Sequence, residues 1–260
     1  MEFIYDYNSL PFYSEEEITQ RERFTHNLAF HLRRLLLETN PAWSMHRIEA
    51  PCLIPRALIS PNYTNEDLWA QEEPDQNRQQ LVLKPETTPS TYAWLREQLR
   101  HSRLRPPVCA WQLSKSFRRE QDQPTKHCRF KEFYQQEFQC LFTADSANDY
   151  FSVIAPKMAE VFMLEVNCPT RLVESDRLPS YSEKTWDVEV WNEDKWMEVC
   201  SMSLRNDFPD PFRFKNKEVP CKVLEIATSP DRLTYCWQRR RQASNLSFAN
   251  NLPGVMPSQS

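Results

Sequence analysis

One short part of the sequence concentrates side chains that could hold a nucleotide. Steps of two residues between 108 and 142 bring one set of side chains to a common face of a strand pair: Arg118, Glu120, Arg129, Phe133 and Glu137. A guanidinium group matches two phosphate oxygens at once, and an aromatic ring among charges offers a stacking surface for a purine. A cross-strand ladder of ion pairs, with Phe133 covered by a neighbouring helix, would give the same pattern. Both interpretations stay open at this level.

The strands that must position these side chains follow from the two-residue period. Polar and apolar residues alternate over 108–120 and again over 128–142, with polar residues 121–126 between them. We therefore expect an antiparallel hairpin with one apolar and one solvent-exposed face. A second hairpin is predicted from the alternation over 186–191 and 196–203.

Helices are predicted on either side of these strands. A capping box begins at Ser14, and apolar residues recur at three- and four-residue steps until Pro41, which predicts one long amphipathic helix. Further helices are expected over 90–101, 149–166 and 230–242, with a short strand over 223–226. The pattern predicts one domain over residues 1–244 and a flexible tail over 245–260.

The sequence F-R-R-E at 117–120, a short loop and R-F-K-E-F at 129–133 resemble motif 2 of the class II aminoacyl-tRNA synthetases. The resemblance implies an α+β fold, an antiparallel sheet flanked by helices, with ATP bound on the sheet. In that family the motif residues hold the α-phosphate, meet the adenine amino group, meet the γ-phosphate and stack on adenine. The corresponding residues here are, in that order, Arg118, Glu120, Arg129 and Phe133.

Other segments resemble the same family in the same order along the chain. The sequence L-K-P-E at 83–86 is similar to a loop that approaches the amino acid in the glycyl, prolyl, threonyl and histidyl enzymes. Candidate amino-acid contacts are Glu86, Glu137, Gln139 and Glu225. For Glu137 and Gln139, an ordinary polar position on a strand is an equally good interpretation.

A metal site is implied by the match of Glu198 and Ser201 to the metal-binding pair of the seryl enzyme. The expected ion is Mg²⁺, which accompanies ATP in this family. Positions three apart point to opposite faces of a regular strand, so a shared ion requires a β-bulge or a strand end between them.

Motif 3 is matched less fully. Residues 225–232 resemble the glycyl form E-P-S-x-G-x-D-R and keep its glutamate, aspartate and arginine. In the family this arginine covers the second side of the adenine, so the resemblance implies that Arg232 acts beside Arg118 as a catalytic residue. Ala227 and Ser229 stand at the serine and glycine positions, where side chains are expected to crowd the nucleotide.

The composition narrows the range of functions. The chain has 260 residues, a net charge of -4 and one glycine, Gly254. The lack of a glycine-rich loop excludes P-loop and Rossmann sites, and the net charge argues against a bulk electrostatic hold on nucleic acid. The 8 cysteines form no C-x-x-C pair, and neither a signal peptide nor a membrane-length apolar run is present. These features predict a cytoplasmic protein with reduced thiols and no membrane contact.

The resemblance implies activation of a small amino acid by ATP and its transfer to a tRNA or to another acceptor, such as a carrier protein or nucleic acid. The long helix and the segment ending at Pro51 are similar to motif 1, which implies a homodimer. About 28 residues follow Arg232, so no anticodon-binding domain is expected. Two alternatives stay open: an inactive paralogue that binds nucleic acid or assists another protein, and a regulatory binder of ATP or an aminoacyl-adenylate. The mixed features leave the amino acid undetermined.

Overall fold

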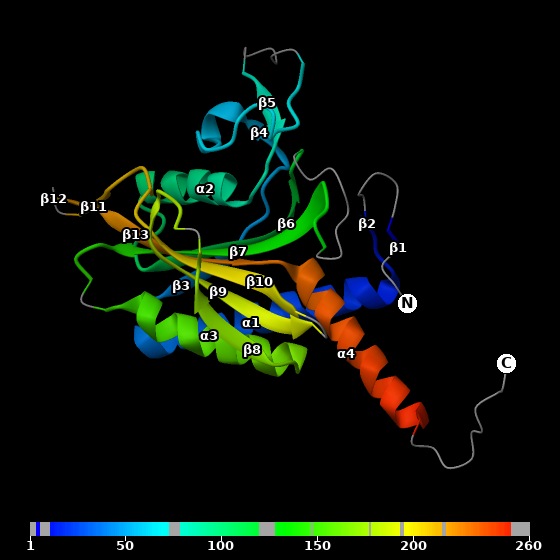
Figure 1. Ribbon diagram of the computed structural model, residues 1–260. Helices are drawn as coiled ribbons and strands as arrows, with labels where there is room; N and C mark the ends of the chain where they lie inside the picture. The colour runs from blue at the N-terminus through cyan, green and yellow to red at the C-terminus, as the bar shows by residue number, and fades with distance from the viewer. Residues whose placement is uncertain are drawn as a thin grey trace.

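The computed structural model describes residues 4–5, 11–72, 79–119, 128–146, 148–176, 178–192, 195–214 and 217–250. Its central sheet has seven strands: β3 (Ser44–Arg47), β6 (Val108–Phe117), β7 (Glu132–Thr143), β8 (Thr170–Glu174), β9 (Ser182–Asn192), β10 (Lys195–Arg205) and β13 (Cys221–Thr228). Their order in the sheet is β3-β6-β7-β13-β10-β9-β8 (Figure 1). Every neighbouring pair is antiparallel except β3 and β6, which run parallel.

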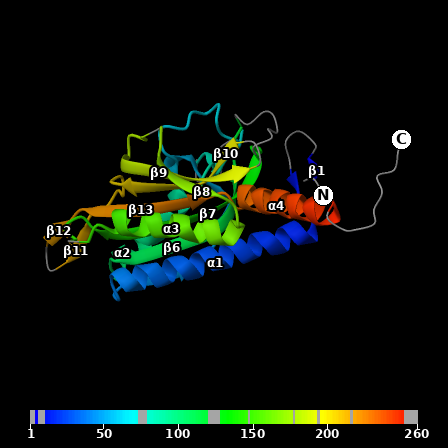
Figure 2. The same ribbon diagram turned by 60° about the horizontal axis from the view of Figure 1, so that its bottom comes forward.

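The described part of the chain has four α-helices: α1 (Glu15–Thr39), α2 (Thr88–Arg100), α3 (Tyr150–Val166) and α4 (Pro230–Asn250). α1 and α3 lie side by side on one face of the sheet, and α2 lies on the other face (Figures 1 and 2). α4 follows β13 directly and contacts α1, β7, β9 and β10. The architecture is the predicted α+β arrangement.

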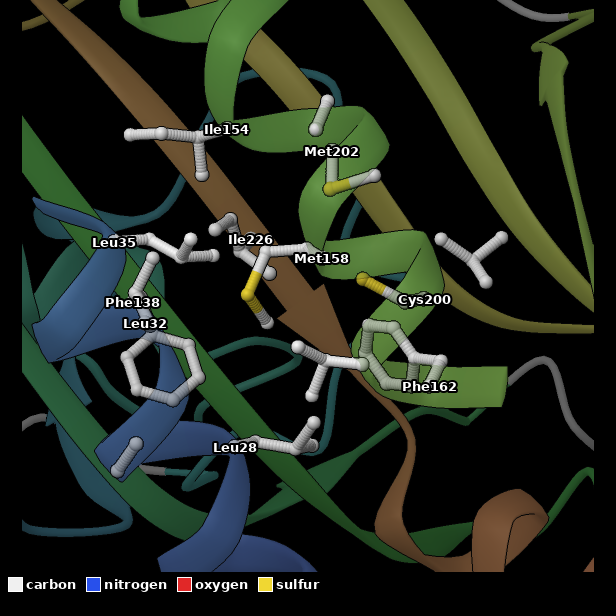
Figure 3. Packing of buried hydrophobic residues seen from close by; sticks show 14 of the residues in the cluster. Leu28, Leu32, Leu35, Phe138, Ile154, Met158, Phe162, Cys200, Met202 and Ile226 are labelled. Carbon is white, nitrogen blue, oxygen red and sulfur yellow. The ribbon is translucent and has the colours of Figure 1, made fainter. Parts of the chain in front are cut away.

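The main core lies between the sheet and the helix pair α1 and α3. Leu28 and Leu32 of α1, Met158 and Phe162 of α3, and Phe138 of β7 are all 0% exposed and meet there (Figure 3). Four-residue spacing places each helical pair on one face. Burying one such side chain stabilises the fold by about 1.5–3 kcal/mol, so this contact fixes the helix layer. A second, smaller apolar cluster holds α2 on the opposite face.

The predicted capping box at the start of α1 is confirmed. The Glu17 N–H donates to Ser14 Oγ at 3.3 Å, and the Ser14 N–H donates to Glu17 Oε2 at 2.6 Å. These two bonds satisfy donors that the first turn of a helix cannot pair internally. At the other end the helix stops at Asn40, one residue before Pro41, as expected.

Several short elements were not predicted. They are β1 (Ile4–Tyr5), β2 (Pro11–Phe12), β8, β11 (Phe212–Phe214), β12 (Lys217–Val219) and the 3₁₀ helix η1 (Arg56–Leu58). A separate two-stranded sheet pairs β4 (Leu53–Pro55) with β5 (Leu81–Leu83). Elements of two to five residues are too short for a periodicity to indicate them.

Several element boundaries differ from those predicted. β6 ends at Phe117 and β7 begins at Glu132, so Arg118 and Arg129 lie just beyond the strands. α2 begins at Thr88, and α4 continues past residue 242 to Asn250. Glu120 lies outside the described residues.

The polar face of the first hairpin is not exposed to solvent, so that prediction was wrong. Gln112 and Gln139 are 0% exposed, and Glu137 is 2% exposed. The start of α2 covers them: the Thr87 hydroxyl donates to Glu137 Oε2 at 2.5 Å, and Gln112 Nε2 donates to the Thr87 carbonyl at 3.2 Å. An alternating pattern shows which face is polar but not what packs on it.

All eight cysteines lie in the described part of the chain and are free, and seven of them are buried. This matches the prediction of core thiols. Within the described residues, no helix is both long and apolar enough to cross a membrane.

Candidate active site

A cavity of about 370 Å³ opens on the face of the sheet opposite α1 and α3. This volume lies in the range of about 300–1,000 Å³ that is usual for ligand sites. All predicted site residues except two line it, from seven separate parts of the chain: Glu86, Arg118, Arg129, Phe133, Glu137, Glu198, Ser201, Glu225 and Arg232. Gln139 does not line the cavity: it is buried, and its amide donates to Glu225. Glu120 is outside the described residues.

One wall of the cavity is built where β6 ends and β7 begins. The Arg118 N–H donates to the Lys131 carbonyl at 2.9 Å, and its Nε donates to the Pro85 carbonyl at 3.1 Å. Its guanidinium carbon lies 5.3 Å from the centre of the Phe133 ring. Arg129 is exposed at the same rim. A cation beside an aromatic ring is suited to a ligand that carries both a phosphate and a flat base.

The bulge required for a shared metal site is present in β10. In the pairing of β10 with β9, Glu198 lies opposite Glu189 while Cys200 lies opposite Val188, so Val199 is an extra residue. This insertion brings Glu198 and Ser201 to the same cavity.

Among the described residues, no group of three or more His, Cys, Asp and Glu side chains could hold a metal ion. An ion at Glu198 and Ser201 would therefore take most of its ligands from elsewhere. Mg²⁺ binds in this way, through one or two protein oxygens, water and substrate phosphates, so the residues present fit Mg²⁺.

Arg232 stands beside this pair, on the first turn of α4. Its Nη1 donates to the Glu198 carbonyl at 2.7 Å and lies 3.8 Å from Glu198 Oε2. The Glu198 side chain is 50% exposed, so this ion pair is accessible to solvent and weak. An anionic ligand could therefore engage the guanidinium without a large loss of protein contacts.

The opposite end of the cavity is acidic and mostly buried. The Thr88 hydroxyl lies 3.0 Å from Glu137 Oε2 and 2.9 Å from Glu225 Oε2. Gln139 Nε2 donates to Glu225 Oε2 at 2.7 Å, and the Tyr63 hydroxyl donates to a third carboxylate, Glu86, at 3.0 Å. Three carboxyl groups thus converge where α2, β7 and β13 meet.

One buried cation offsets part of the negative charge at this acidic end. Arg205, which is 3% exposed, donates to Glu225 Oε2 at 2.6 Å and to both oxygens of Asp207 at 3.0 and 2.7 Å. Its charge is shared between Glu225 and Asp207, so Glu86 and Glu137 are left with hydroxyl donors. An excess of buried carboxyl groups is a suitable environment for a cationic ligand group.

The pKa values reflect this imbalance. Burial, and then the charges of Glu225 and Glu86, raise the pKa of Glu137 to about 7. Burial also raises the pKa of Glu86, although the charge of Arg205 opposes the rise. Raised carboxyl pKa values in a cavity are typical of functional sites, because burial there disfavours the ionised forms until a ligand stabilises them.

The floor between the two ends is formed by Ala227, Thr228 and Ser229. These residues join β13 to α4, and the Ser229 N–H donates to the Val199 carbonyl at 2.9 Å. Ser229, which stands at the glycine position of motif 3, is thus part of the cavity wall.

A family model described as the tRNA synthetase class II core domain (G, H, P, S and T) matches residues 63–226 of this chain. The chain belongs to this family. The class II synthetase fold predicted from the sequence motifs is therefore confirmed, and the cavity occupies the face of the sheet on which the motif residues were placed.

Similar curated relatives of this class II core are glycine–tRNA ligases. That of Mycoplasmopsis synoviae is 28% identical over 177 residues, covering 61% of this chain and 39% of the relative. That of Mycoplasma capricolum is 30% identical over 134 residues, covering 49% of this chain and 29% of the relative. The chain spans less than half the length of these relatives.

Two solved structures share the fold. Giardia lamblia prolyl-tRNA synthetase in complex with prolyl-adenylate superposes with a TM-score of 0.70 at 16% identity, covering 90% of this chain and 49% of that chain. Cryptosporidium parvum prolyl-tRNA synthetase complexed with halofuginone and AMPPNP gives a TM-score of 0.67 at 12% identity, covering 90% and 48%.

Some residues of the class II site were given no role from the sequence. Arg205 and Tyr181 pack together, with the guanidinium carbon 4.0 Å from the ring centre, and Tyr181 lines the cavity. Thr87, Thr88 and Tyr63 supply the hydroxyl groups around the carboxylates. Only Arg205 carried a usable signal, because an arginine inside an apolar strand pattern needs a buried acidic partner.

Proposed function

We propose that this class II core binds ATP and a small amino acid in the one cavity and joins them to give an aminoacyl-adenylate and pyrophosphate. The observation that supports it is the division of the cavity. Arginines and an aromatic ring line one end, where a nucleotide would lie, and buried carboxyl groups line the other, where an ammonium group would lie. The curated relatives make glycine the first amino acid to test.

The reaction needs no nucleophile from the protein. A carboxylate oxygen of the amino acid forms a bond to the α-phosphorus while the bond from that phosphorus to the pyrophosphate oxygen breaks. The protein contributes by holding both substrates in line and by stabilising negative charge at phosphorus. Arg118 would stabilise that charge, and Arg129 and Arg232 would hold the outer phosphates.

We assign base recognition to two residues of motif 2. Phe133 would stack on the adenine, as its place beside Arg118 allows, and Glu120 would meet the adenine amino group. Mg²⁺ would be held by Glu198 and Ser201, where it neutralises phosphate charge when bound.

We assign amino-acid recognition to the residues of the acidic end. Glu86, Glu137 and Glu225 would receive the ammonium group, and Gln139 would orient Glu225 through its 2.7 Å hydrogen bond. Tyr181 and Arg205 fill the space behind them, which favours a small side chain. Transfer would follow when an acceptor hydroxyl attacks the acyl carbon and AMP leaves; a tRNA or another carrier supplies that hydroxyl.

The test is amino-acid-dependent exchange of pyrophosphate into ATP. Exchange with one amino acid of a full panel is expected, and Arg118→Ala should abolish it. Arg119→Ala is the matched control: Arg119 is the neighbouring residue, is exposed and does not line the cavity. Absence of exchange with every amino acid, in protein that is folded and binds ATP, would refute the proposal.

A second candidate is a non-catalytic binder of ATP or of an aminoacyl-adenylate. The observation in its favour is the cavity floor, where Ser229 stands at the glycine position of the family pattern and adds a side chain. Calorimetric titration with ATP and Mg²⁺ separates the two functions. Binding without exchange supports the second candidate, and exchange excludes it.

A homodimer is part of the proposal. The edge strand β3 and the adjoining end of α1 form a groove of about 280 Å³ lined by Leu36, Leu37, Trp43 and Met45, among others. Leu37 is 40% exposed although it is apolar, and β3 has hydrogen-bonding groups free for another strand on its outer edge. Light scattering after gel filtration should give a dimer mass, and Leu37→Glu should give a monomer. A wild-type monomer at micromolar concentration would contradict this part.

A further inference from the structure

A second cavity, of about 660 Å³, lies at the far end of α2 from the acidic end of the active site. We call it the arginine cavity. It is enclosed by the last turns of α2, the loop that follows, and the chain leading into β11. Its lining includes Arg96, Arg100, Arg105, Asp210 and Arg213. It shares no lining residue with the active site: its first lining residue on α2, Arg96, follows Thr88 at the acidic end by eight residues, about 12 Å along the helix axis.

The lining is strongly cationic. Four arginines, Arg96, Arg100, Arg105 and Arg213, face one carboxylate, Asp210. The whole chain has a net charge of -4, so this local excess runs against the overall balance. A concave surface with charges of one sign concentrates its field on the enclosed space and attracts ions of the opposite sign.

One of the four arginines is already committed within the protein. Arg96 Nε donates to Asp210 Oδ2 at 2.7 Å and its Nη2 donates to Oδ1 at 3.3 Å, a two-bond contact that fixes the cavity wall. Arg96 therefore shapes the cavity wall.

The ion pairs of Arg100 and Arg213 are weak competitors for an anion. Arg100 lies 3.6 Å from Glu97, and its side chain is 68% exposed; Arg213 lies 2.7 Å from Glu218, and its side chain is 80% exposed. Exposed pairs of this kind contribute little to stability, so their guanidinium groups can turn to a ligand at small cost.

A simpler explanation is that cations at the end of a helix offset its dipole. It accounts for Arg100, which lies in the last turn of α2, but not for Arg105 or Arg213, which lie outside the helix. Leu99, Leu104 and Phe212, which pack against the apolar cluster under α2, add apolar surface to the same cavity.

We propose that the arginine cavity binds a phosphate group carried by an organic molecule, with Arg100, Arg105 and Arg213 around the phosphate and the apolar surface beneath the organic part. A guanidinium group pairs with phosphate through two parallel hydrogen bonds, whereas a lysine ammonium acts only as a point charge. The phosphate can belong to a free nucleotide or to an RNA strand. The site does not depend on the activity of the first cavity.

The experiment measures binding of inorganic pyrophosphate by calorimetry and of a fluorescein-labelled 12-nucleotide single-stranded RNA by anisotropy. The double variant Arg100→Ala with Arg213→Ala is compared with wild type. The matched control is Arg23→Ala with Arg34→Ala, which removes two exposed, ion-paired arginines from α1. Arg118→Ala removes an arginine of the active site, so binding that remains in it belongs to another site.

Binding should weaken about ten-fold in the Arg100/Arg213 variant, because two guanidinium groups that pair with the phosphate are removed. Binding should stay unchanged in the control and should survive in part in Arg118→Ala. A parallel loss for RNA assigns the phosphate to a nucleic-acid strand, and a loss for pyrophosphate alone assigns it to a small molecule. Equal affinities in the Arg100/Arg213 variant and its control, for both probes, would overturn the proposal. Circular dichroism of each variant confirms that the fold is retained.

Discussion

Replacing Glu137 with glutamine should make the protein more stable above neutral pH while removing its ability to activate an amino acid. Glu137 is 2% exposed and lies between Glu86 and Glu225 without an ion-pair partner among the described residues. Glutamine keeps the size and the acceptor oxygen for the Thr87 and Thr88 hydroxyls. It removes only the charge, so the two effects have one cause.

The magnitude follows from the pKa of Glu137. Burial and the neighbouring carboxylates raise it from 4.5 to about 7, which corresponds to about 3 kcal/mol because one pKa unit is worth about 1.4 kcal/mol. A carboxyl whose pKa is raised by folding favours the folded state below pH 4.5, and this contribution is lost as the pH rises through 7. Wild type should therefore lose up to about 3 kcal/mol relative to Glu137→Gln between pH 4.5 and pH 8.

The measurement is urea unfolding of both proteins at half-unit steps from pH 5 to pH 8. The difference in unfolding free energy should move steadily in favour of Glu137→Gln as the pH rises. Glu132→Gln, on the same strand but partly exposed and paired with Lys115, controls for removal of a carboxylate as such. A difference that stays flat with pH would refute the reasoning, because it would show that the cavity already stabilises the ionised carboxylate.

The functional half of the prediction uses the exchange assay. An ammonium group favours the ionised form of Glu137, so the affinity of wild type for the amino acid should rise from pH 6 to pH 8. Glu137→Gln should show no exchange at any pH. Full activity in Glu137→Gln would show that Glu137 does not recognise the amino acid and that its burial serves only the fold.

Three further changes test other parts of the molecule. Ser14→Ala removes the capping box of α1 and should cost about 1 kcal/mol, seen as a lower midpoint in thermal unfolding, whereas an unchanged midpoint would mean that the cap carries no stability. Deletion of Val199 removes the bulge and turns Glu198 from the cavity, so exchange should fall about ten-fold or more at limiting Mg²⁺ in a folded protein; unchanged Mg²⁺ dependence would contradict the assigned ion. Arg205→Ala leaves Glu225 buried without its cation and should cost about 3–5 kcal/mol in urea unfolding, and a loss below about 1 kcal/mol would show that water replaces the guanidinium.

Much of the site could be predicted from residue types and spacing. The two-residue alternation placed Arg118, Phe133 and Glu137 on one face, and the structure brings them to one cavity. The sequence also showed that Glu198 and Ser201 could share an ion only across a bulge, and β10 contains that bulge. These inferences succeeded because strand geometry is local and the alternation is long enough to reveal it.

The parts that could not be predicted depend on contacts between distant segments. The hairpin face was expected to be wet because its residues are polar, yet the start of α2 covers it and turns Glu137 into a buried acid. Arg205 lies 20 residues from Glu225 in sequence, and no spacing rule indicates that their side chains meet. The charge balance of the cavity is a property of the packed molecule.

The near absence of glycine affects the space above the cavity floor and not the backbone conformation of the floor. The positive-φ residues of the described chain are Ser102, Cys128 and Asn167, so the floor at Ala227 and Ser229 follows ordinary backbone geometry. Glycine's conformational freedom is therefore not needed there. Ser229 also gives what glycine could not: its hydroxyl lies 3.5 Å from the backbone nitrogen of Arg232, in the position of a cap at the start of α4. Ser229 thus narrows the floor by a hydroxymethyl group relative to glycine, while it also helps to hold the helix turn from which the Arg232 guanidinium reaches the cavity.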